Sequence, residues 1–519
     1  MTANLPGGRD SNWLHSRWHV ITAILVAAGL RLAHLLENRF HPDEALYAAF
    51  ARLIASGPGH GLLLSHIVVD KPPLAFYINA VSVALLGGHE FALRLPSFFF
   101  SLISVVLVYR LGRRLYGPTA ATVAAWAMTL SPFAIQFAIT IFVDPLLTTL
   151  LLAGMVLMVA RRTGWAVVFL GLAFATKQTA LLFIPLTMLL GLVVLPRPVQ
   201  FRQAVGFLLR AALLTAAALA LVVLAVLAWD HQRGAPVGTL TQGFSDNAPT
   251  RLVSLDEVKP RAEVLLAMLH QFSGSTAIDL LFLAGLALLV VADLRQDAPR
   301  ATTDGLLLGF SLVYIGAYWL LSVNLFDRYL LPLLPLAFVL LGRAAAVALE
   351  VLRAGVDRLA RNGGQQRWAA GGWRALTTLA PVILVLFLIG NVAATNYDFS
   401  PIGGDHGALD GIDDAARFVH TLPSNVVLYD HWLSWEFDYY LFDHPVDTFW
   451  FPDATTMAAD LAASGSARPH YVAVPWWASV AEIDAAAGRA GYRLVPVHTS
   501  FRRDGLPSIV IYRLEPRSA

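Results

Sequence analysis

The segment Gly206–Trp229, GFLLRAALLTAAALALVVLAVLAW, contains one charged residue and is long enough to cross a bilayer as a helix. The chain has 519 residues, of which 57% are hydrophobic and only 14% charged, and its mean hydropathy is +0.62. A soluble chain would carry roughly 25% charged residues. The sequence therefore predicts a polytopic membrane protein. Similar apolar blocks are Val20–Leu36, Ala120–Ala138, Leu146–Ala160, Leu280–Ala292, Gly305–Val323, Leu330–Leu349 and Leu376–Ala394.

Composition excludes several functional classes. The chain has no cysteine, so disulfides, iron–sulfur clusters and thiolate catalysis are excluded. The net charge of +2 and the absence of a basic stripe with interleaved aromatic residues argue against nucleic-acid binding. The first apolar block lacks a small-residue cleavage site, and we expect it to be a retained helix rather than a signal peptide.

Arginine clusters between the apolar blocks predict the topology, because short cytoplasmic loops carry an excess of positive charge. Placing every cluster inside requires the segment Pro73–Gly88 to lie at the membrane interface rather than to cross it. The prediction is then about eleven spans, with the N-terminus cytoplasmic and the C-terminus outside. The clusters are Arg9 and Arg17; Arg110, Arg113 and Arg114; Arg161 and Arg162; Arg197 and Arg202; Arg295 and Arg300; and Arg353, Arg358, Arg361, Arg367 and Arg374.

Two domains are predicted. Residues 1–395 form an all-α transmembrane domain with long external loops at about 37–94 and 230–275, each containing an amphipathic helix (Glu44–Ser56 and Asp256–Phe272). Residues 396–519 alternate strand-like and helix-like runs, which is typical of a small α/β domain, here extracytoplasmic. The strand-like runs are Val426–Tyr429, Val446–Phe451, Tyr471–Val474, Tyr492–Val497 and Ile509–Leu514, and the helix-like runs are Met457–Ala463 and Ala481–Ala490.

Ionisable residues gather at the external ends of the predicted helices. Charged groups at such depth are costly, so they are usually paired or functional. These residues are Asp43 and Glu44 after the first span, Asp70 and Lys71 before two prolines, Arg94, Asp144, Lys177 and Arg328.

An ordered series of short motifs surrounds these residues, from about residue 20 to residue 345. Through this series the sequence resembles the polytopic glycosyltransferases of the GT-C superfamily, in the branch of the protein O-mannosyltransferases and the aminoarabinose transferase of lipid A. The motifs are Asp43-Glu44-Ala45-Leu46-Tyr47, Asp70-Lys71-Pro72-Pro73-Leu74, Ala92-Leu93-Arg94-Leu95-Pro96-Ser97, Gly112-Arg113-Arg114-Leu115-Tyr116-Gly117, Ser131-Pro132, Asp144-Pro145-Leu146, Thr176-Lys177 and Arg328-Tyr329-Leu330-Leu331-Pro332.

The resemblance implies a GT-C fold in a bacterial plasma membrane and transfer of a sugar from a polyprenyl-phosphate donor, with inversion. The acceptor is a lipid, glycan or protein on the outer face. An attacking hydroxyl needs a general base, and a leaving phosphate needs fixed cations. The resemblance implies that Asp43 is the base and that Glu44, its neighbour, and Asp144 are also catalytic. It implies that the donor phosphate is bound by Lys71, Arg94, Lys177 and Arg328. Asp70 has a supporting role.

Each of these residues has an alternative structural interpretation. Asp43 and Asp144 both stand where a helix begins, so either carboxylate can be a helix cap. Lys71 can be a snorkelling anchor, and Arg94 can hold the end of a span. Arg328 can pair with the aspartate beside it or with another external carboxylate.

Three further questions are left open by the sequence. External histidines (His41, His66 and His270) allow a divalent metal, although no pair has the spacing of a helical ligand motif. For the stretch Trp432–Tyr440, core packing is favoured over contact with an acceptor. Trp229, Trp319, Trp476 and Trp477 are interpreted as packing or membrane-interface residues.

Two other functions compete with glycosyl transfer. A secondary transporter or lipid flippase would place ionisable groups near the bilayer midplane in two related halves, whereas here the charges gather at one face. An O-antigen ligase or polymerase is also polytopic, but its long external loop lies late in the chain, where this sequence has a separate domain.

Overall fold

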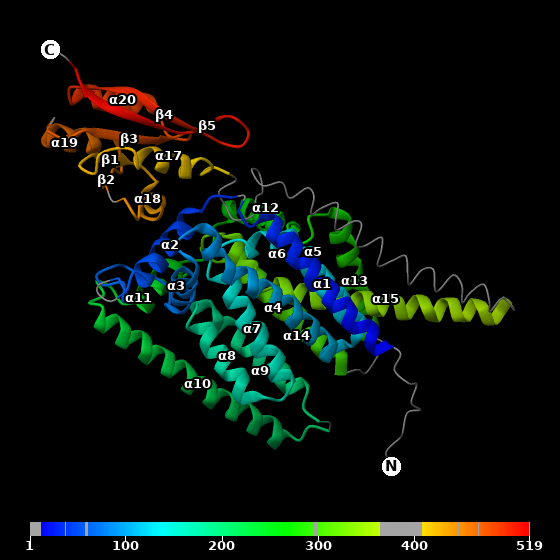
Figure 1. Ribbon diagram of the computed structural model, residues 1–519. Coiled ribbons are helices and arrows are strands. Elements are labelled where there is room, and N and C mark those ends of the chain that lie inside the picture. The colour runs from blue at the N-terminus through cyan, green and yellow to red at the C-terminus, as the bar shows by residue number, and fades with distance from the viewer. Residues whose placement is uncertain are drawn as a thin grey trace.

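The computed structural model describes residues 12–36, 38–57, 61–196, 198–294, 299–363, 407–444, 446–465 and 467–517. A helical domain comes first in the chain and a smaller sheet domain follows it (Figure 1). The predicted span Leu376–Ala394 and the predicted boundary between residues 395 and 396 lie outside the described residues, as do Arg9, Arg197, Arg295, Arg367 and Arg374.

The helical domain confirms the prediction of a multi-pass membrane protein. Among the described residues, five helices are long and apolar enough to cross a bilayer: Glu90–Tyr116, Phe201–Gln232, Thr276–Leu294, Arg300–Leu320 and Leu334–Leu352. The helices are α1 (Asn12–His34), α2 (Pro42–Ala55), α3 (Leu74–Leu86), α4 (Glu90–Tyr116), α5 (Pro118–Leu130), α6 (Pro132–Ala138), α7 (Asp144–Val159), α8 (Thr163–Phe174), η1 (Gln178–Phe183), α9 (Ile184–Val193), α10 (Phe201–Gln232), α11 (Thr239–Asn247), α12 (Leu255–His270), α13 (Thr276–Leu294), α14 (Pro299–Leu320), η2 (Asp327–Leu330) and α15 (Leu334–Gly363).

The predicted span Ala120–Ala138 is broken into α5 and α6, which meet at an angle of 59°. Pro132 has no backbone N–H to continue the hydrogen bonding of α5, so the helix ends before it. The Ser131 hydroxyl accepts a hydrogen bond from the Ala134 N–H and so caps α6. The break keeps α6 buried inside the bundle, close below the start of α2.

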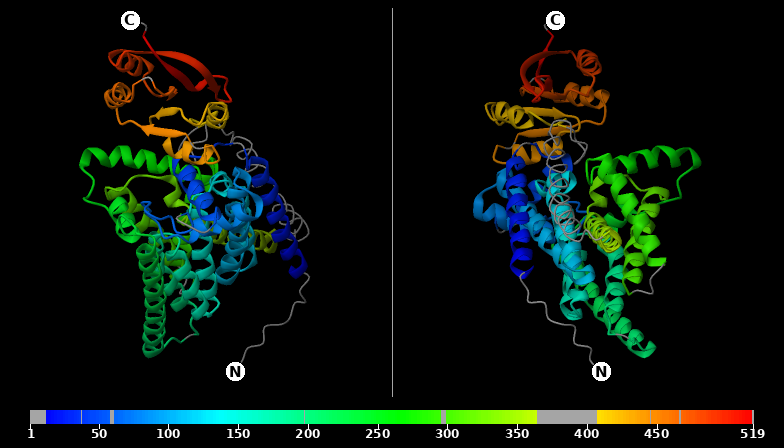
Figure 2. Two further views of the ribbon diagram at one scale, coloured as in Figure 1. Left: turned by 60° about the vertical axis from the view of Figure 1, so that its left-hand side comes forward. Right: turned by 90° about the vertical axis from the view of Figure 1, so that its right-hand side faces the viewer.

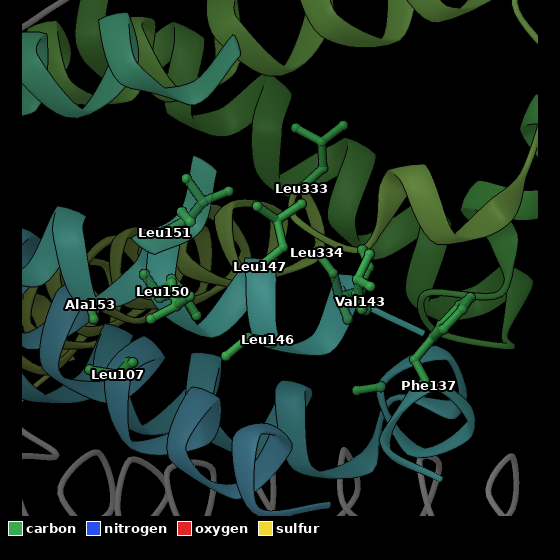
Figure 3. Close-up of a cluster of buried hydrophobic side chains, with 14 of the residues drawn as sticks. Leu107, Phe137, Val143, Leu146, Leu147, Leu150, Leu151, Ala153, Leu333 and Leu334 are labelled. Carbon is green, nitrogen blue, oxygen red and sulfur yellow. The ribbon is translucent and has the colours of Figure 1, made fainter. Parts of the chain in front are cut away.

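Helix α7 is the centre of the bundle. It is apolar on all sides, as a fully buried helix should be. Leu146, Leu147, Leu150 and Leu151 of α7 lie with Leu107 of α4 in one buried cluster (Figure 3). Because α7 begins at Asp144, this packing places a carboxylate inside the protein.

Helix α3, in the segment predicted to lie at the membrane interface, has 13 residues and is tied to the helical domain at its start and to the sheet domain just beyond its end. At its start, the Leu74 N–H donates to the Ala175 carbonyl, beside Lys177. Just beyond its end, the Gly88 carbonyl accepts a hydrogen bond from Tyr439 of the sheet domain. Helices α1 and α10, in contrast, run from the far end of the bundle toward the sheet domain (Figure 2).

The second domain confirms the predicted α/β layer, and each of the five predicted strands is present. The sheet order is β2-β1-β3-β5-β4; β1 is parallel to β2 and β3, and β5 is antiparallel to β3 and β4. Helices cover both faces, so the sheet has an apolar core on each side. The elements are α17 (Ile412–Val419), β1 (Val427–Asp430), α18 (Ser434–Tyr440), β2 (Asp447–Trp450), α19 (Ala454–Ser464), β3 (His470–Pro475), α20 (Val480–Arg489), β4 (Tyr492–Phe501) and β5 (Pro507–Pro516).

The sheet domain docks on the helical domain through α18, which lies against α2 (Figure 1). The Tyr439 ring packs edge-on against Phe40 with 4.9 Å between the ring centroids. The Tyr440 hydroxyl donates to Glu90 at 2.6 Å. Aromatic packing and a partly buried hydrogen bond together fix α18 against the segment between α1 and α4.

Candidate active site

A cavity of about 760 Å³ lies between α2 and α18, on the side of the helical domain that faces the sheet domain. Five separate parts of the chain line it: α2, the segment before α3, α11, the segment around η2, and α18. Four of the predicted site residues contribute to its wall, namely Asp43, Asp70, Lys71 and Arg328.

Asp43 does not cap its helix. The N-cap of α2 is His41, whose imidazole accepts a hydrogen bond from the Asp43 N–H at 3.2 Å. The Asp43 carboxylate is free to pair with Arg328, and their nearest atoms are 2.6 Å apart. This answers the two alternatives for these residues, because Arg328 reaches a distant external carboxylate rather than only its neighbour.

Asp43 is held ionised by its surroundings. Burial by itself raises the pKa of the Asp43 carboxyl, but the positive charges of Arg328 and Lys71 outweigh burial and lower the pKa below its ordinary value. Burial lowers the pKa of His41 to about 4, so its imidazole is neutral at neutral pH and accepts the hydrogen bond described above. A charged carboxylate able to accept a proton therefore faces the cavity.

Lys71 enters the cavity wall from the segment before α3. Its ammonium pairs with Asp70 and lies 5.5 Å from the centre of the Tyr47 ring. The Gln178 side chain donates to the Asp70 carbonyl at 2.9 Å, which ties this segment to η1. Lys71 is only 8% exposed, so it is not a snorkelling anchor in this fold.

Lys177 and Asp144 are brought together, but beneath the cavity rather than in its wall. Their charged atoms are 2.6 Å apart, and the two side chains are 5% and 2% exposed. Asp144 is not the N-cap of α7, since Val143 holds that position. Lys177 lies 4.2 Å from the centre of the Tyr329 ring, and Tyr329 does line the cavity. The pair therefore touches the cavity through Tyr329.

Glu44 and Arg94 are placed away from the cavity wall. Glu44 completes the capping box of α2 and accepts a hydrogen bond from the Ile141 N–H at 2.8 Å. Arg94 is 1% exposed, donates to the Leu35 carbonyl at 2.6 Å and pairs with Glu90 at 3.4 Å. Both residues anchor the first external loop, and the structure does not bring Arg94 to the other cations.

Sequence reasoning missed the contribution of α11, and for the stretch that contains α18 it favoured core packing over contact with an acceptor. Asn247 accepts a hydrogen bond from the Tyr329 hydroxyl at 2.6 Å, and Asp246 lies beside it in the wall. Trp435 and Asp438 of α18 form the opposite side. For α11 the only available signal was the predicted external placement of its segment, which says nothing about its partners.

The external histidines are dispersed. His270 pairs with Asp279 at 2.6 Å, while His41 caps α2. Within the described ranges, no group of three or more histidine and carboxylate side chains is arranged to hold a metal ion. The described residues thus provide no preformed metal centre beside Asp43.

Comparison with known proteins places this site in context. Residues 70–229 match the family model for dolichyl-phosphate-mannose-protein mannosyltransferase. A putative mannosyltransferase, YkcB, from Bacillus subtilis is 38% identical over 119 residues, which cover 22% of this chain and 17% of the relative. An undecaprenyl phosphate-alpha-4-amino-4-deoxy-L-arabinose arabinosyl transferase from Proteus mirabilis is 30% identical over 198 residues, covering 34% of this chain and 35% of the relative. The matches therefore span about a third or less of these relatives.

Solved structures share the whole architecture. ArnT from Cupriavidus metallidurans, in a crystal structure with undecaprenyl phosphate bound, superposes with a TM-score of 0.61 at 16% identity and covers 96% of this chain and 98% of its own. The archaeal oligosaccharyltransferase AglB from Archaeoglobus fulgidus superposes with a TM-score of 0.52 at 12% identity, covering 96% and 74%. The predicted GT-C fold is confirmed.

Proposed function

We propose that this chain is an integral-membrane glycosyltransferase that moves a sugar from a polyprenyl-phosphate donor to a hydroxyl of a lipid, glycan or protein acceptor. The observation that carries the proposal is the convergence of Asp43, Lys71 and Arg328 on one cavity, from parts of the chain that are far apart in sequence. The family-model match and the fold shared with ArnT support the same activity.

The reaction follows from these three side chains. The acceptor oxygen attacks the anomeric carbon of the donor, and the Asp43 carboxylate takes the hydroxyl proton. A new carbon–oxygen bond forms while the bond from the anomeric carbon to the phosphate oxygen breaks, and its electron pair stays on the phosphate. Lys71 and Arg328 stabilise the charge that develops there. Attack from the face opposite the phosphate inverts the anomeric carbon.

The remaining predicted residues act by positioning. Asp70 holds the Lys71 ammonium, and the Lys177–Asp144 pair supports the Tyr329 ring in the cavity wall. Glu44 and Arg94 anchor the first external loop and thereby the start of α2. In this proposal Arg94 does not bind the donor phosphate.

The cavity and the sheet domain lie on the outer face of a bacterial plasma membrane in this proposal, with the N-terminus inside. The arginine clusters support this orientation, and so do the bacterial relatives. The absence of cysteine allows a direct test. His89→Cys, at the exposed start of α4, should react with a membrane-impermeant maleimide in intact cells, whereas Arg114→Cys near its exposed other end should react only after permeabilisation. The opposite pattern would invert the proposed topology.

Asp43→Asn tests the chemistry. The variant keeps the size of the side chain but cannot accept a proton, a function that typically contributes about 10²–10⁴-fold to rate. We expect transfer from undecaprenyl-phosphate mannose or undecaprenyl-phosphate aminoarabinose, whichever the wild type uses, to fall at least about a hundredfold. Binding of undecaprenyl phosphate should persist.

A matched control is Asp443→Asn. Asp443 is an exposed carboxylate that pairs with Arg52 and does not line the cavity, so this variant should keep wild-type turnover. Full turnover by Asp43→Asn would move the base to another carboxylate. Failure of the wild type to bind undecaprenyl phosphate would instead favour a different class of membrane protein.

A further inference from the structure

Three tryptophans stand at one edge of the sheet domain. Trp432 follows β1, Trp450 ends β2 and Trp477 follows β3, and these three strands are parallel neighbours. All three residues are therefore at the carboxyl ends of the strands. In open α/β sheets, this edge is where ligands bind. Trp435, at the start of α18, lies beside them.

The four tryptophans line a second cavity, of about 500 Å³, which is bordered below by His41 and Pro42. Their exposed fractions are 61% for Trp432, 43% for Trp435, 48% for Trp450 and 40% for Trp477. The sequence favours core packing for the stretch Trp432–Tyr440. Phe437 and Tyr439 are indeed buried, but Trp432 and Trp435 are exposed. Exposed indoles converging from three segments of the chain are not explained by packing.

The backbone at Trp432, one of the residues that line this cavity, is strained. Its φ is +68°, in the left-handed region that bulky residues avoid. The Asp430 carboxylate holds the turn by accepting hydrogen bonds from the Leu433 N–H at 3.3 Å and the Ser434 hydroxyl at 2.8 Å. Strain of this kind persists where the surrounding structure enforces it, and it clusters at ligand sites.

The lining combines broad aromatic faces with a few polar groups. Ser434, Glu436 and His41 are the polar members, and the others are apolar. A sugar ring has matching surfaces, because its axial C–H groups form an apolar face that stacks on an indole while its hydroxyls reach polar groups at the rim. Pockets that bind small molecules have the same composition of apolar walls with a few polar contacts.

We propose that this tryptophan-lined cavity binds a saccharide unit of the acceptor, a role that rests on the proposed glycosyl transfer. Trp435 lines both cavities, and the consecutive residues His41, Pro42 and Asp43 pass from one to the other. A sugar stacked among the tryptophans is thus adjacent to the proposed base. The acceptor class is carbohydrate, carried on a lipid or as a glycan, rather than an unglycosylated peptide.

Saturation-transfer NMR on the full-length protein in lipid nanodiscs tests the proposal. The probes are the methyl glycosides of mannose, glucose, galactose and N-acetylglucosamine. At least one should bind the wild type, and Trp450→Ala and Trp477→Ala should weaken that binding at least about fivefold through loss of a stacking contact. Both variants should bind undecaprenyl phosphate like the wild type, which also shows that they are folded.

Trp165→Ala is the control. Trp165 is a tryptophan of α8 in the helical domain; it is 63% exposed and does not line the tryptophan-lined cavity. This variant should bind the glycosides like the wild type. The proposal is overturned if no glycoside binds the wild type, if the variants and the control behave alike, or if only a peptide or the bilayer contacts these tryptophans. Loss of undecaprenyl phosphate binding by the wild type would count against the glycosyl transfer instead.

Discussion

Two ion pairs of the same kind lie at the same end of the helical domain, yet their surroundings differ. Arg328 and Asp43 are 2.6 Å apart in the wall of the cavity, where the Asp43 side chain is 24% exposed. Lys177 and Asp144 are also 2.6 Å apart, but the Asp144 side chain is 2% exposed. We therefore expect the exposed pair to take part in chemistry and the sealed pair to support the fold.

Breaking the sealed pair should have the largest effect. Lys177→Met leaves the Asp144 carboxylate buried without its cation, which costs about 3–5 kcal/mol in comparable pairs. We expect poor accumulation and a lowered midpoint of thermal unfolding in detergent. The double variant Lys177→Met with Asp144→Leu removes both charges and should restore accumulation. If the single variant accumulated normally, the distinction between the two pairs would fail.

Removing a cation from the open cavity should affect ligand binding rather than folding. Lys71→Met loses a charge-assisted contact to the donor phosphate worth roughly 1.5–3 kcal/mol, so undecaprenyl phosphate should bind about ten- to a hundredfold more weakly. Microscale thermophoresis would measure this affinity. Arg94→Met is the contrasting variant, because Arg94 lies outside the cavity and its loss should lower stability more than donor affinity. Unchanged donor affinity in Lys71→Met would exclude Lys71 from the phosphate site.

The smallest expected effect is a shift in the pH dependence of the rate of glycosyl transfer. Arg328 lowers the pKa of Asp43 against the opposing effect of burial, so transfer should persist above that lowered pKa and be lost as pH falls through it. In Arg328→Gln the pKa of Asp43 rises, and the acid limb of the residual activity should move to higher pH. Arg52→Gln, which removes a cation outside the cavity wall, should leave the limb in place. An unmoved limb in Arg328→Gln would show that another group is titrating.

Much of the secondary structure could be predicted from local stretches of the sequence. A helix or strand is determined largely by neighbouring residues. The length of the apolar blocks therefore predicted the spans, and the alternation of strand-like with helix-like runs predicted the five strands of the sheet domain. The interfacial placement of Pro73–Gly88 followed from counting charges and stays a prediction; the segment forms the 13-residue helix α3. The break at Pro132 was the exception, since a buried bent helix has the same apolar composition as a span.

The sequence by itself determined that this is a multi-pass protein with a sheet domain, and it predicted that Asp43, Lys71 and Arg328 stand at one membrane boundary. Only the tertiary structure decided that these three share a cavity, that His41 rather than Asp43 caps α2, and that Arg94 faces backbone carbonyls instead. It also gathered the four tryptophans. The physical reason is distance along the chain: hydrophobic periodicity acts over a few residues, whereas the pairing of Asp43 with Arg328 depends on how the whole bundle packs.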